Sequence, residues 1–382
     1  MSALRVGLFT ECYHPIRNGI VASIDMLART LREGGHEAIV VTPEMPAYRD
    51  GCGGVVRVAS LPLPTRTAYR LTVPYLPRTI GALSIVHAHS PFVTGWLSVH
   101  AAHRARVPLV FTYHTQLEAY AHYVPFESNT TRNAATLLTR IFANGADAVI
   151  VPTRAMEARL RALGVRARID VVPSGIDRAL FASGRRRRDV RARFGADDGN
   201  KLVLSVGRLG REKNLELALH AFARLENAAA RFVIVGDGAH RAVLERLAAR
   251  LQIASRTTFA GELARNALPD VYASADAFVF TSSSDTQGLV LVEALAAGTP
   301  VVAVDTPQTR DVLADAGIVC ANDPLAVAAA LRSALAGARP NSRHGLEVAD
   351  IYDGSAIGAR VLALYDSLLA APPVRKLVAA LH

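Results

Sequence analysis

The sequence lacks the features that mark several classes of protein. Its three cysteines, Cys12, Cys52 and Cys320, lie far apart without metal-ligand spacing, which is typical of buried or loop thiols in a reducing compartment. No stretch reaches the ~18 apolar residues of a spanning helix, and "MSALRVGLFT" lacks the parts of a signal peptide. No zinc finger, aromatic RNA-binding motif or helix-turn-helix pattern indicates nucleic acid as a partner. What remains is a globular composition, 382 residues long and 51% hydrophobic, with the length of about two domains.

Acidic residues are missing from one long stretch. The chain carries a net charge of +10, and residues 1–180 hold 19 arginines against 12 acidic residues. Within that half, residues 51–117 contain no acid and six arginines. Part of the stretch, "RTAYRLTVPYLPRTIGALS", mixes basic with aromatic and aliphatic residues, which is typical of an interfacial docking site on an anionic membrane. The candidates are Arg66, Tyr69, Arg70, Tyr75 and Arg78; an ordinary arginine-rich surface is the alternative.

Strands alternate with helices along nearly the whole chain. "RVGLF" and "EAIVVTP" are short strands, and the residues between them have helical apolar spacing and end at a glycine pair. Residues 178–201 are polar and arginine-rich, which predicts a linker with a short helix, and the run Arg185–Arg188 within it is typical of a solvated face. The alternation then restarts. It predicts an α/β protein of two Rossmann-like, doubly wound parallel-sheet domains facing across a cleft. Their expected bounds are 1–178 and 179–354, with a C-terminal helix at about 355–382 crossing back onto the first domain.

In folds of this kind ligands bind at the loops that follow the strands. After "LVLSV", the turn "GRLGREKN" carries Arg208, Arg211 and Lys213, and cations on such a loop suit a diphosphate.

A second loop of this kind follows "AFVF". It is "SSSDTQGLVLVEALAAGTP", residues 282–300, where Ser283, Ser284 and Asp285 are good N-cap residues. A helix is expected from about Gly288 to Gly298, and its first N–H groups would form an anion site. Glu293 sits in an apolar run, where a buried carboxylate needs a partner such as a pair of ribose hydroxyls. An exposed glutamate is the alternative.

The first domain offers three further candidate loops. "ECYHPIRNGIVAS" places Gly19 near a helix start, a second site for a phosphate. His114 ends the strand "PLVF" among threonine, tyrosine and glutamine, which indicates a ligand contact. His87 and His89 in "HAHSPF" are similarly placed with a weaker signal. They predict no metal site, because no third ligand stands at a suitable spacing.

Together, "NGI", "YHT", "VVPSGID", "GRLGREKN", "VGDG", "FAGEL" and "SDTQGLVLVEALAAGTPVVA" resemble glycosyltransferase family 4, the retaining enzymes of the GT-B fold. The resemblance covers nearly the whole chain and implies catalytic or donor-binding roles for a defined set of residues. Arg208 and Lys213 would hold the donor diphosphate, and Glu293 the ribose. The remaining donor-site residues would be Gly19, His114, Asp285, Gln287, Gly288 and Leu289, with His114 and Asp285 on the sugar. Asp285 stands where the family usually has the first glutamate of its E-x7-E motif.

The stretch "YHTQLEAYAHYVP" with "DTQG" further resembles the bacterial diacylglycerol α-glucosyltransferases. This implies UDP-glucose as donor, a lipid acceptor, Glu118 and Tyr120 on the acceptor side, and a peripheral position on the cytoplasmic face of the cell membrane. No metal or other cofactor is expected, because cationic side chains would replace the metal. Three alternatives stay open: GDP-mannose-dependent transfer to phosphatidylinositol or another glycolipid, transfer to a soluble acceptor, and a non-catalytic nucleotide-sugar-binding subunit. A dehydrogenase is disfavoured, since no G-x-G-x-x-G follows the first strand.

Overall fold

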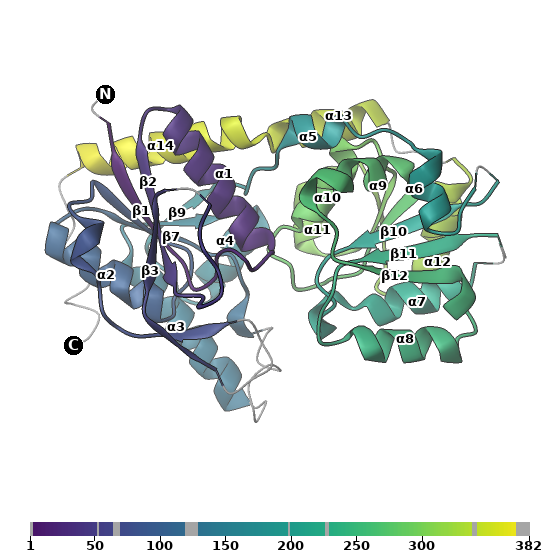
Figure 1. The fold of residues 1–382 in the computed structure, drawn as a ribbon, viewed down its shortest axis with the longest axis horizontal. Coiled ribbons are helices and arrows are strands. Elements are labelled where there is room, and N and C mark those ends of the chain that lie inside the picture. Colours follow the sequence, from purple (N-terminus) through teal and green to yellow (C-terminus); the bar gives the residue numbers. More distant parts are fainter. Residues whose placement is uncertain are drawn as a thin grey trace. The chain divides into compact units, whose positions relative to one another are not determined.

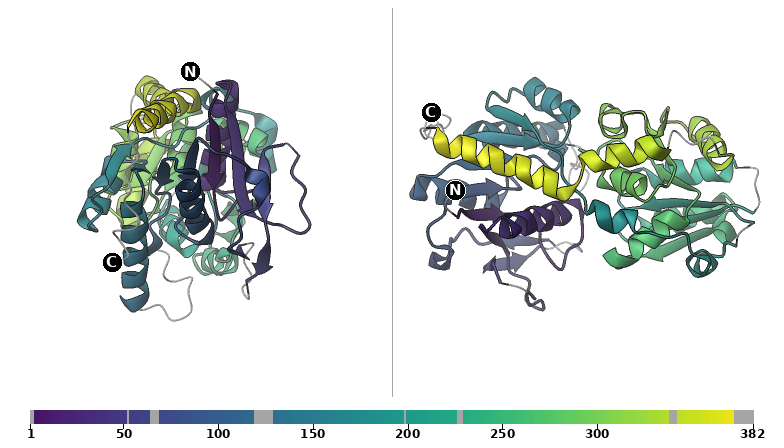
Figure 2. Two further views of the ribbon diagram at one scale, coloured as in Figure 1. Left: turned by 90° about the vertical axis from the view of Figure 1, so that its left-hand side faces the viewer. Right: turned by 90° about the horizontal axis from the view of Figure 1, so that it is seen from above.

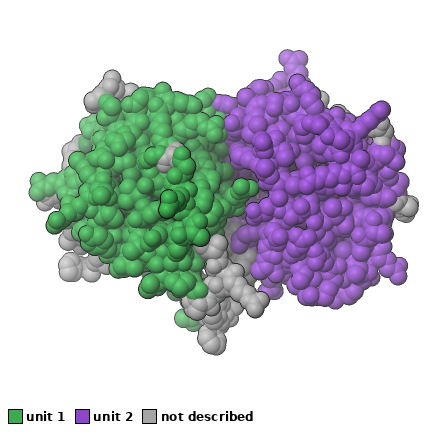
Figure 3. All heavy atoms as spheres, viewed as in Figure 1, with its two compact units in different colours: residues 1–175, 354–382 green, residues 176–353 purple. Residues whose placement is uncertain are grey.

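The computed structural model describes residues 3–51, 53–63, 69–118, 129–197, 199–225, 229–337 and 342–371. The chain divides into two compact units, one formed by Met1–Gly175 with Gly354–His382 and the other by Ile176–Asp353 (Figure 3). The sequence analysis placed these boundaries after residues 178 and 354. In both units strands and helices alternate, as the sequence predicted (Figure 1). Among the described helices, none combines the length and the apolar character needed to cross a membrane.

The first unit is built on a parallel sheet. Its described strands lie in the order β3-β2-β1-β6-β7-β8-β9, and all neighbouring pairs are parallel. Most of these strands are continuous apolar runs, because helices cover both faces of a parallel sheet. The strands are β1 (Arg5–Phe9), β2 (Glu37–Pro43), β3 (Val55–Val58), β6 (Ile85–Ala88), β7 (Leu109–Thr112), β8 (Ala148–Val151) and β9 (Arg168–Val171).

Two apolar cores lie on opposite faces of this sheet. Consecutive strand residues point to opposite faces, so Leu8 joins the core under α1 and α14, while Phe9 joins the core under α2, α3 and α4. α1 starts at the N-cap Asn18, whose side chain accepts from the backbone N–H of Val21 at 2.9 Å. The helices of this unit are α1 (Gly19–Glu33), the 3₁₀ turn η1 (Arg78–Ile80), α2 (Val93–Ala105), α3 (Asn129–Gly145), α4 (Arg154–Ala162) and α14 (Gly354–Ala370).

The C-terminal helix α14 returns to the first unit and packs beside α1 (Figure 2). The two helices meet at glycines. A Cβ on Gly354 would lie 2.2 Å from Met26 Sδ, and one on Gly358 would lie 2.2 Å from Thr30 Cγ2. The helix then places Tyr365, fully buried, over the sheet. The predicted crossing helix is therefore α14, and residues 372–382 lie outside the described residues.

A short antiparallel hairpin departs from the α/β alternation. It consists of β4 (Ser60–Pro62) and β5 (Arg70–Thr72), with Leu61 and Leu71 as cross-strand partners. Glu11 ties the hairpin to α2, because its carboxylate accepts from the Thr72 hydroxyl at 2.9 Å and from the backbone N–H of Thr94 at 3.1 Å. The sequence analysis did not predict this hairpin.

The second unit has its own parallel sheet, with the described strands in the order β12-β11-β10-β13-β14-β15. The strands are β10 (Leu202–Val206), β11 (Arg231–Val235), β12 (Thr257–Gly261), β13 (Ala277–Phe280), β14 (Val301–Val304) and β15 (Ile318–Cys320). The α-helices are α5 (Arg178–Ala182), α6 (Arg188–Arg193), α7 (Leu215–Ala223), α8 (Arg241–Arg250), α9 (Leu268–Ser274), α10 (Leu289–Ala296), α11 (Pro307–Leu313), α12 (Pro324–Leu335) and α13 (Ser342–Ile351). Short 3₁₀ turns are η3 (Arg211–Lys213), η4 (Ala254–Arg256) and η5 (Arg265–Ala267).

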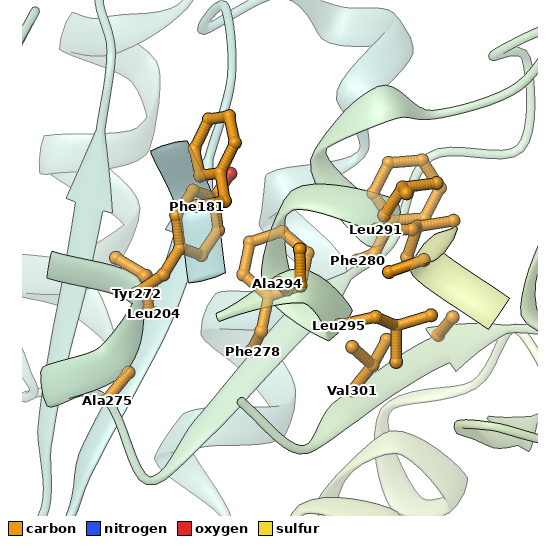
Figure 4. Packing of buried hydrophobic residues seen from close by; sticks show 14 of the residues in the cluster. Phe181, Leu204, Tyr272, Ala275, Phe278, Phe280, Leu291, Ala294, Leu295 and Val301 are labelled. Atoms are coloured by element: carbon orange, nitrogen blue, oxygen red, sulfur yellow. The ribbon is translucent and has the colours of Figure 1, made fainter. Parts of the chain in front are cut away.

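The predicted linker at 178–201 is wrong, because the segment packs into the second unit. Phe181 of α5 is fully buried and lies edge-on against Tyr272, in the apolar cluster drawn in Figure 4. Arg191 of α6 is 1% exposed, and its guanidinium donates to the backbone carbonyl of Ser274 at 2.7 Å and meets the Asp276 carboxylate at 3.1 Å. A buried arginine is stable when its donors are satisfied in this way. The neighbouring run 185–188 is exposed, as expected.

Candidate functional site

Two loops of the second unit meet at the carboxyl ends of β10 and β13, which are neighbouring parallel strands. The first loop contains η3, and the second leads into α10. Hydroxyls of the second loop bind the backbone of the first: Thr281 donates to the carbonyl of Lys213 at 3.0 Å, and Ser282 to that of Glu212 at 3.1 Å. These bonds bring Arg208, Lys213 and Asp285 to one edge of the sheet, where the sequence predicted them.

Two ion pairs organise the charges at this edge. Lys213 Nζ lies 2.5 Å from Asp285 Oδ1, and Arg208 Nη2 lies 2.6 Å from Oε1 of Glu212, whose side chain is 1% exposed. Asp285 Oδ2 is buried without a hydrogen-bond partner in the described part of the chain. A buried oxygen without a donor is costly, so this atom is suited to accept from a ligand hydroxyl.

The start of α10 differs from the prediction in its cap. Ser283, Ser284 and Asp285 do not cap the helix; the N-cap is Gly288, at φ 76° in the left-handed region. A glycine adopts this conformation without the steric cost of a Cβ. Among the described residues no side chain caps the helix, which begins at Leu289. Without a side-chain cap, its first N–H groups are suited to bind an anion, as at other helix N-termini.

Glu293 lies inside α10, and it is 7% exposed, so it is not a surface glutamate. The Tyr272 hydroxyl donates to Glu293 Oε2 at 2.9 Å, and Arg265 Nη1 lies 4.0 Å from Oε1. Burial raises the pKa of Glu293, while Arg265 and the Tyr272 hydrogen bond oppose that rise. The carboxylate thus already has protein partners, which the sequence analysis did not find. Its role toward ribose stays a prediction. Gln287, at the other end of the motif, is buried.

In the first unit, His114 follows β7, and the structure brings it together with His87 and His89. His89 Nδ1 lies 2.9 Å from His114 Nε2, and the rings of His87 and His89 stack at 4.3 Å. His114, which the sequence analysis named only as a ligand contact, is thus a third histidine beside His87 and His89 that their spacing did not reveal. In the described residues, however, no group of three or more histidine, cysteine or acidic side chains could hold a metal. Gly19, the other candidate here, is the first residue of α1.

The acceptor-side candidates are distributed around the hairpin and the loop after β7. Tyr69 and Tyr75 are exposed, and Arg78 is exposed on η1. Arg70 is bound to the opposite strand, since its guanidinium donates to the Ser60 hydroxyl at 2.8 Å. The Glu118 carboxylate accepts from Arg159 Nε of α4 at 2.7 Å. Two candidates, Arg66 and Tyr120, lie outside the described residues.

Comparison with solved structures identifies the fold class of the chain. Sucrose-phosphate synthase of Thermosynechococcus elongatus superimposes with a TM-score of 0.78 at 22% identity, covering 96% of this chain and 99% of that one. The fold is GT-B, and the predicted class of two Rossmann-like parallel-sheet domains is confirmed.

The sequence comparisons identify the family. A model described as "Glycosyltransferase Family 4" matches residues 17–180, and "Glycosyl transferases group 1" matches residues 186–347. The α-monoglucosyldiacylglycerol synthase of Streptococcus pneumoniae is 32% identical over 82% of this chain and 74% of its own length. A GDP-mannose-dependent α-mannosyltransferase of Mycobacterium tuberculosis is 34% identical over 82% of each chain. The chain belongs to the family 4 glycosyltransferases, as its motifs predicted.

Proposed function

We propose that this glycosyltransferase moves a hexose, glucose from UDP-glucose, with retention of configuration to a lipid hydroxyl such as that of diacylglycerol. The observation that carries the proposal is the edge where β10 and β13 end. There the ammonium of Lys213 contacts Asp285, one Asp285 oxygen has no partner in the described residues, and α10 begins without a side-chain cap. Cations and helix N–H groups suit a diphosphate, and the unpaired oxygen suits a sugar hydroxyl. Its similarity to a glucosyldiacylglycerol synthase supports the acceptor.

The proposed chemistry stabilises a leaving diphosphate. As the bond from the anomeric carbon to the diphosphate oxygen breaks, negative charge grows on that oxygen and positive charge on the sugar. Lys213 has three donor hydrogens, so it can hold Asp285 and a phosphate oxygen together. Arg208 and the first turn of α10 would supply further donors. The acceptor hydroxyl attacks the same face of the sugar, and its proton passes to the leaving phosphate. In this proposal the side-chain cations do the work of a metal ion.

A transfer assay with labelled donor tests this assignment. Arg208→Ala and Lys213→Ala should each lower kcat/KM by about 10²-fold, the loss typical of a donor to developing charge. Arg250→Ala is the matched control, because Arg250 is exposed at the C-terminal end of α8, away from the carboxyl ends of the strands. Turnover should persist in EDTA. Complete loss in EDTA, or full activity of both cation variants, would contradict the proposal.

A second donor is favoured by one specific observation. The GDP-mannose-dependent relative of M. tuberculosis matches this chain at 34% identity, against 32% for the glucosyltransferase. Mannose transfer from GDP-mannose to phosphatidylinositol or another glycolipid is therefore the alternative. Purified protein is given UDP-glucose and GDP-mannose at equal concentration. The donor whose sugar dominates in the product is the preferred one.

Membrane docking is part of the proposal. The hairpin region exposes four large apolar side chains, the hairpin patch: Leu61, Tyr69, Leu71 and Tyr75. Leu61 and Leu71 are cross-strand partners, so they point to the same face of the hairpin. The patch lies in the part of the chain that lacks acidic residues. The charged residues near this apolar patch in the sequence are all basic, and such a combination suits the anionic inner face of the cell membrane.

Vesicle co-sedimentation tests the docking surface. Binding to vesicles with anionic lipid should weaken as salt rises, because the electrostatic part is screened. At any one salt concentration, the double variant Leu61→Ser, Leu71→Ser should bind these vesicles less than wild type does. Leu325→Ser is the control, since Leu325 is exposed on α12 of the other unit. If the double variant binds as wild type does, the patch is not the docking surface; if no vesicles bind at low salt, a soluble acceptor is favoured.

A further inference from the structure

Three imidazoles lie side by side at the carboxyl ends of two neighbouring strands. His87 is the third residue of β6, His89 follows two residues later on the same face, and His114 follows β7. The His87 and His89 rings stack at 4.3 Å, and those of His89 and His114 at 5.2 Å. Only the last pair shares a hydrogen bond, at 2.9 Å between His89 Nδ1 and His114 Nε2. The glycosyltransferase function as proposed above assigns no role to His87 or His89.

Hydrogen bonds at both ring nitrogens hold His87 in place at one end of this stack. Its Nδ1 lies 2.7 Å from the Tyr365 hydroxyl of α14, and its Nε2 lies 2.6 Å from the Thr112 hydroxyl of β7. Both ring nitrogens therefore have partners. His87 and Tyr365 are fully buried, and His89 is 3% exposed, so the surrounding side chains restrict the ring of His89.

Hydrogen bonding decides where the protons reside. Burial lowers the pKa of His114 to about 4 and holds that of His89 well below its usual range, so both rings are neutral near pH 7. A neutral imidazole has one donor and one acceptor nitrogen. His89 Nε2 is buried without a hydrogen-bond partner among the described residues. A buried N–H without an acceptor is rarer than an acceptor without a donor. The proton of His89 therefore resides on Nδ1 and is donated to His114 Nε2.

We propose that His89 is a positioning residue that fixes the ring of His114 and holds it in the Nδ1–H tautomer. The consequence is chemical. With Nε2 filled by the bond from His89, the proton of the neutral His114 ring resides on Nδ1, so the ring has no lone pair left to act as a base. The inference rests on the proposed function, in which His114 has the contact with the donor sugar that the family resemblance implies.

NMR of the full-length, ligand-free protein with ¹⁵N-labelled histidine tests the tautomer directly. His114 should show a protonated Nδ1 and an unprotonated Nε2, with the assignment made by loss of the signal in His114→Gln. This readout needs no substrate, so it stands even if the donor or acceptor of the proposed reaction is wrong. His89 also lines a pocket with Ser23 and Ser174. If a bound water there accepts a proton from His89 Nε2, His114 will appear as the Nε2–H tautomer, which overturns the proposal.

Two substitutions of equal size separate positioning from packing. His89→Asn keeps an N–H donor near the place of Nδ1, whereas His89→Leu has a similar shape and no donor. The asparagine variant should retain the His114 tautomer signature, with kcat/KM within about threefold of wild type. The leucine variant should lose the signature, and its kcat/KM should fall about tenfold, the effect of one hydrogen bond.

Tyr365→Phe removes a hydrogen bond of the cluster without touching the His89–His114 pair. It should lower Tm and keep the signature. Equal losses in the asparagine and leucine variants, or an unchanged His114 signature in His89→Leu, would overturn the positioning role; if His89→Leu fails to fold, wild type and His89→Asn still decide the tautomer.

Discussion

Lowering the pH from 7 to 5 should destabilise the first unit through its buried histidines. The pKa of His87 is lowered to about 3 and that of His89 well below 6.5, in both cases mainly because burial removes the ring from water. In the unfolded chain both rings return to a pKa near 6.5. Below that pH the unfolded state binds protons that the folded state cannot, so stability falls as the pH falls toward the folded pKa values.

The magnitude follows from the interval between the two pKa values. At pH 5, which is 1.5 units below the unfolded pKa, each fully buried neutral histidine lowers the free energy of unfolding by about 2 kcal/mol relative to high pH. His89→Asn removes one such group. Between pH 7 and pH 5 its free energy of unfolding should therefore fall by about 2 kcal/mol less than that of wild type.

Urea unfolding followed by Trp96 fluorescence measures this in the relevant unit. Trp96 is the only tryptophan of the chain, and it lies on α2 of the first unit with its ring edge-on to Phe142 at 5.6 Å. His103→Asn is the control, because His103 is exposed on α2 and should leave the pH dependence unchanged. Carboxylates that titrate over the same range are common to all three proteins and cancel in the difference. Equal pH dependence of wild type and His89→Asn would refute the buried, neutral state of His89.

The other predictions concern the second unit and the helix contact of the first. Asp285→Glu should stay active with a shifted donor preference, whereas Asp285→Ala should lose most turnover; a fully active alanine variant in the transfer assay would mean that the acid does not touch the sugar. Tyr272→Phe removes a donor from the buried carboxylate of Glu293, and it should lower stability by about 1–3 kcal/mol in thermal unfolding; an unchanged Tm would show that Arg265 suffices. Gly358→Ala adds a Cβ 2.2 Å from Thr30 Cγ2, so chemical unfolding should show a loss of about 1–3 kcal/mol, and no loss would mean that α14 can move away from α1.

The periodic parts of the fold were predictable from the sequence. Buried parallel strands are short apolar runs, and α1 shows its buried face as apolar residues at helical spacing. Parallel topology also explains why Lys213 and Asp285 were predicted at one edge although they are 72 positions apart. Loops that follow neighbouring strands must meet there.

Contacts between separate elements could not be predicted in the same way. Tyr365 meets His87 from 278 positions away, and nothing in the local pattern of α14 distinguishes this tyrosine from a core residue. Tyr272 meets Glu293 for the same reason, through the packing of α9 on α10. The cap of α10 was missed because Ser283, Ser284 and Asp285 favour N-caps by type, while the left-handed backbone at Gly288 decides where the helix begins. Arg191 was placed in a linker because local charge does not reveal the carbonyls that bind it.

The most direct test of the proposed function is a lipid transfer assay read by mass spectrometry. Purified protein is given isotopically labelled UDP-glucose and GDP-mannose with vesicles that contain diacylglycerol and phosphatidylinositol. We expect a labelled hexosyl-diacylglycerol derived from UDP-glucose, abolished in Lys213→Ala and retained in Arg250→Ala. A mannosylated phosphatidylinositol would replace the proposed donor and acceptor, and nucleotide release without any labelled lipid would contradict transfer to a lipid.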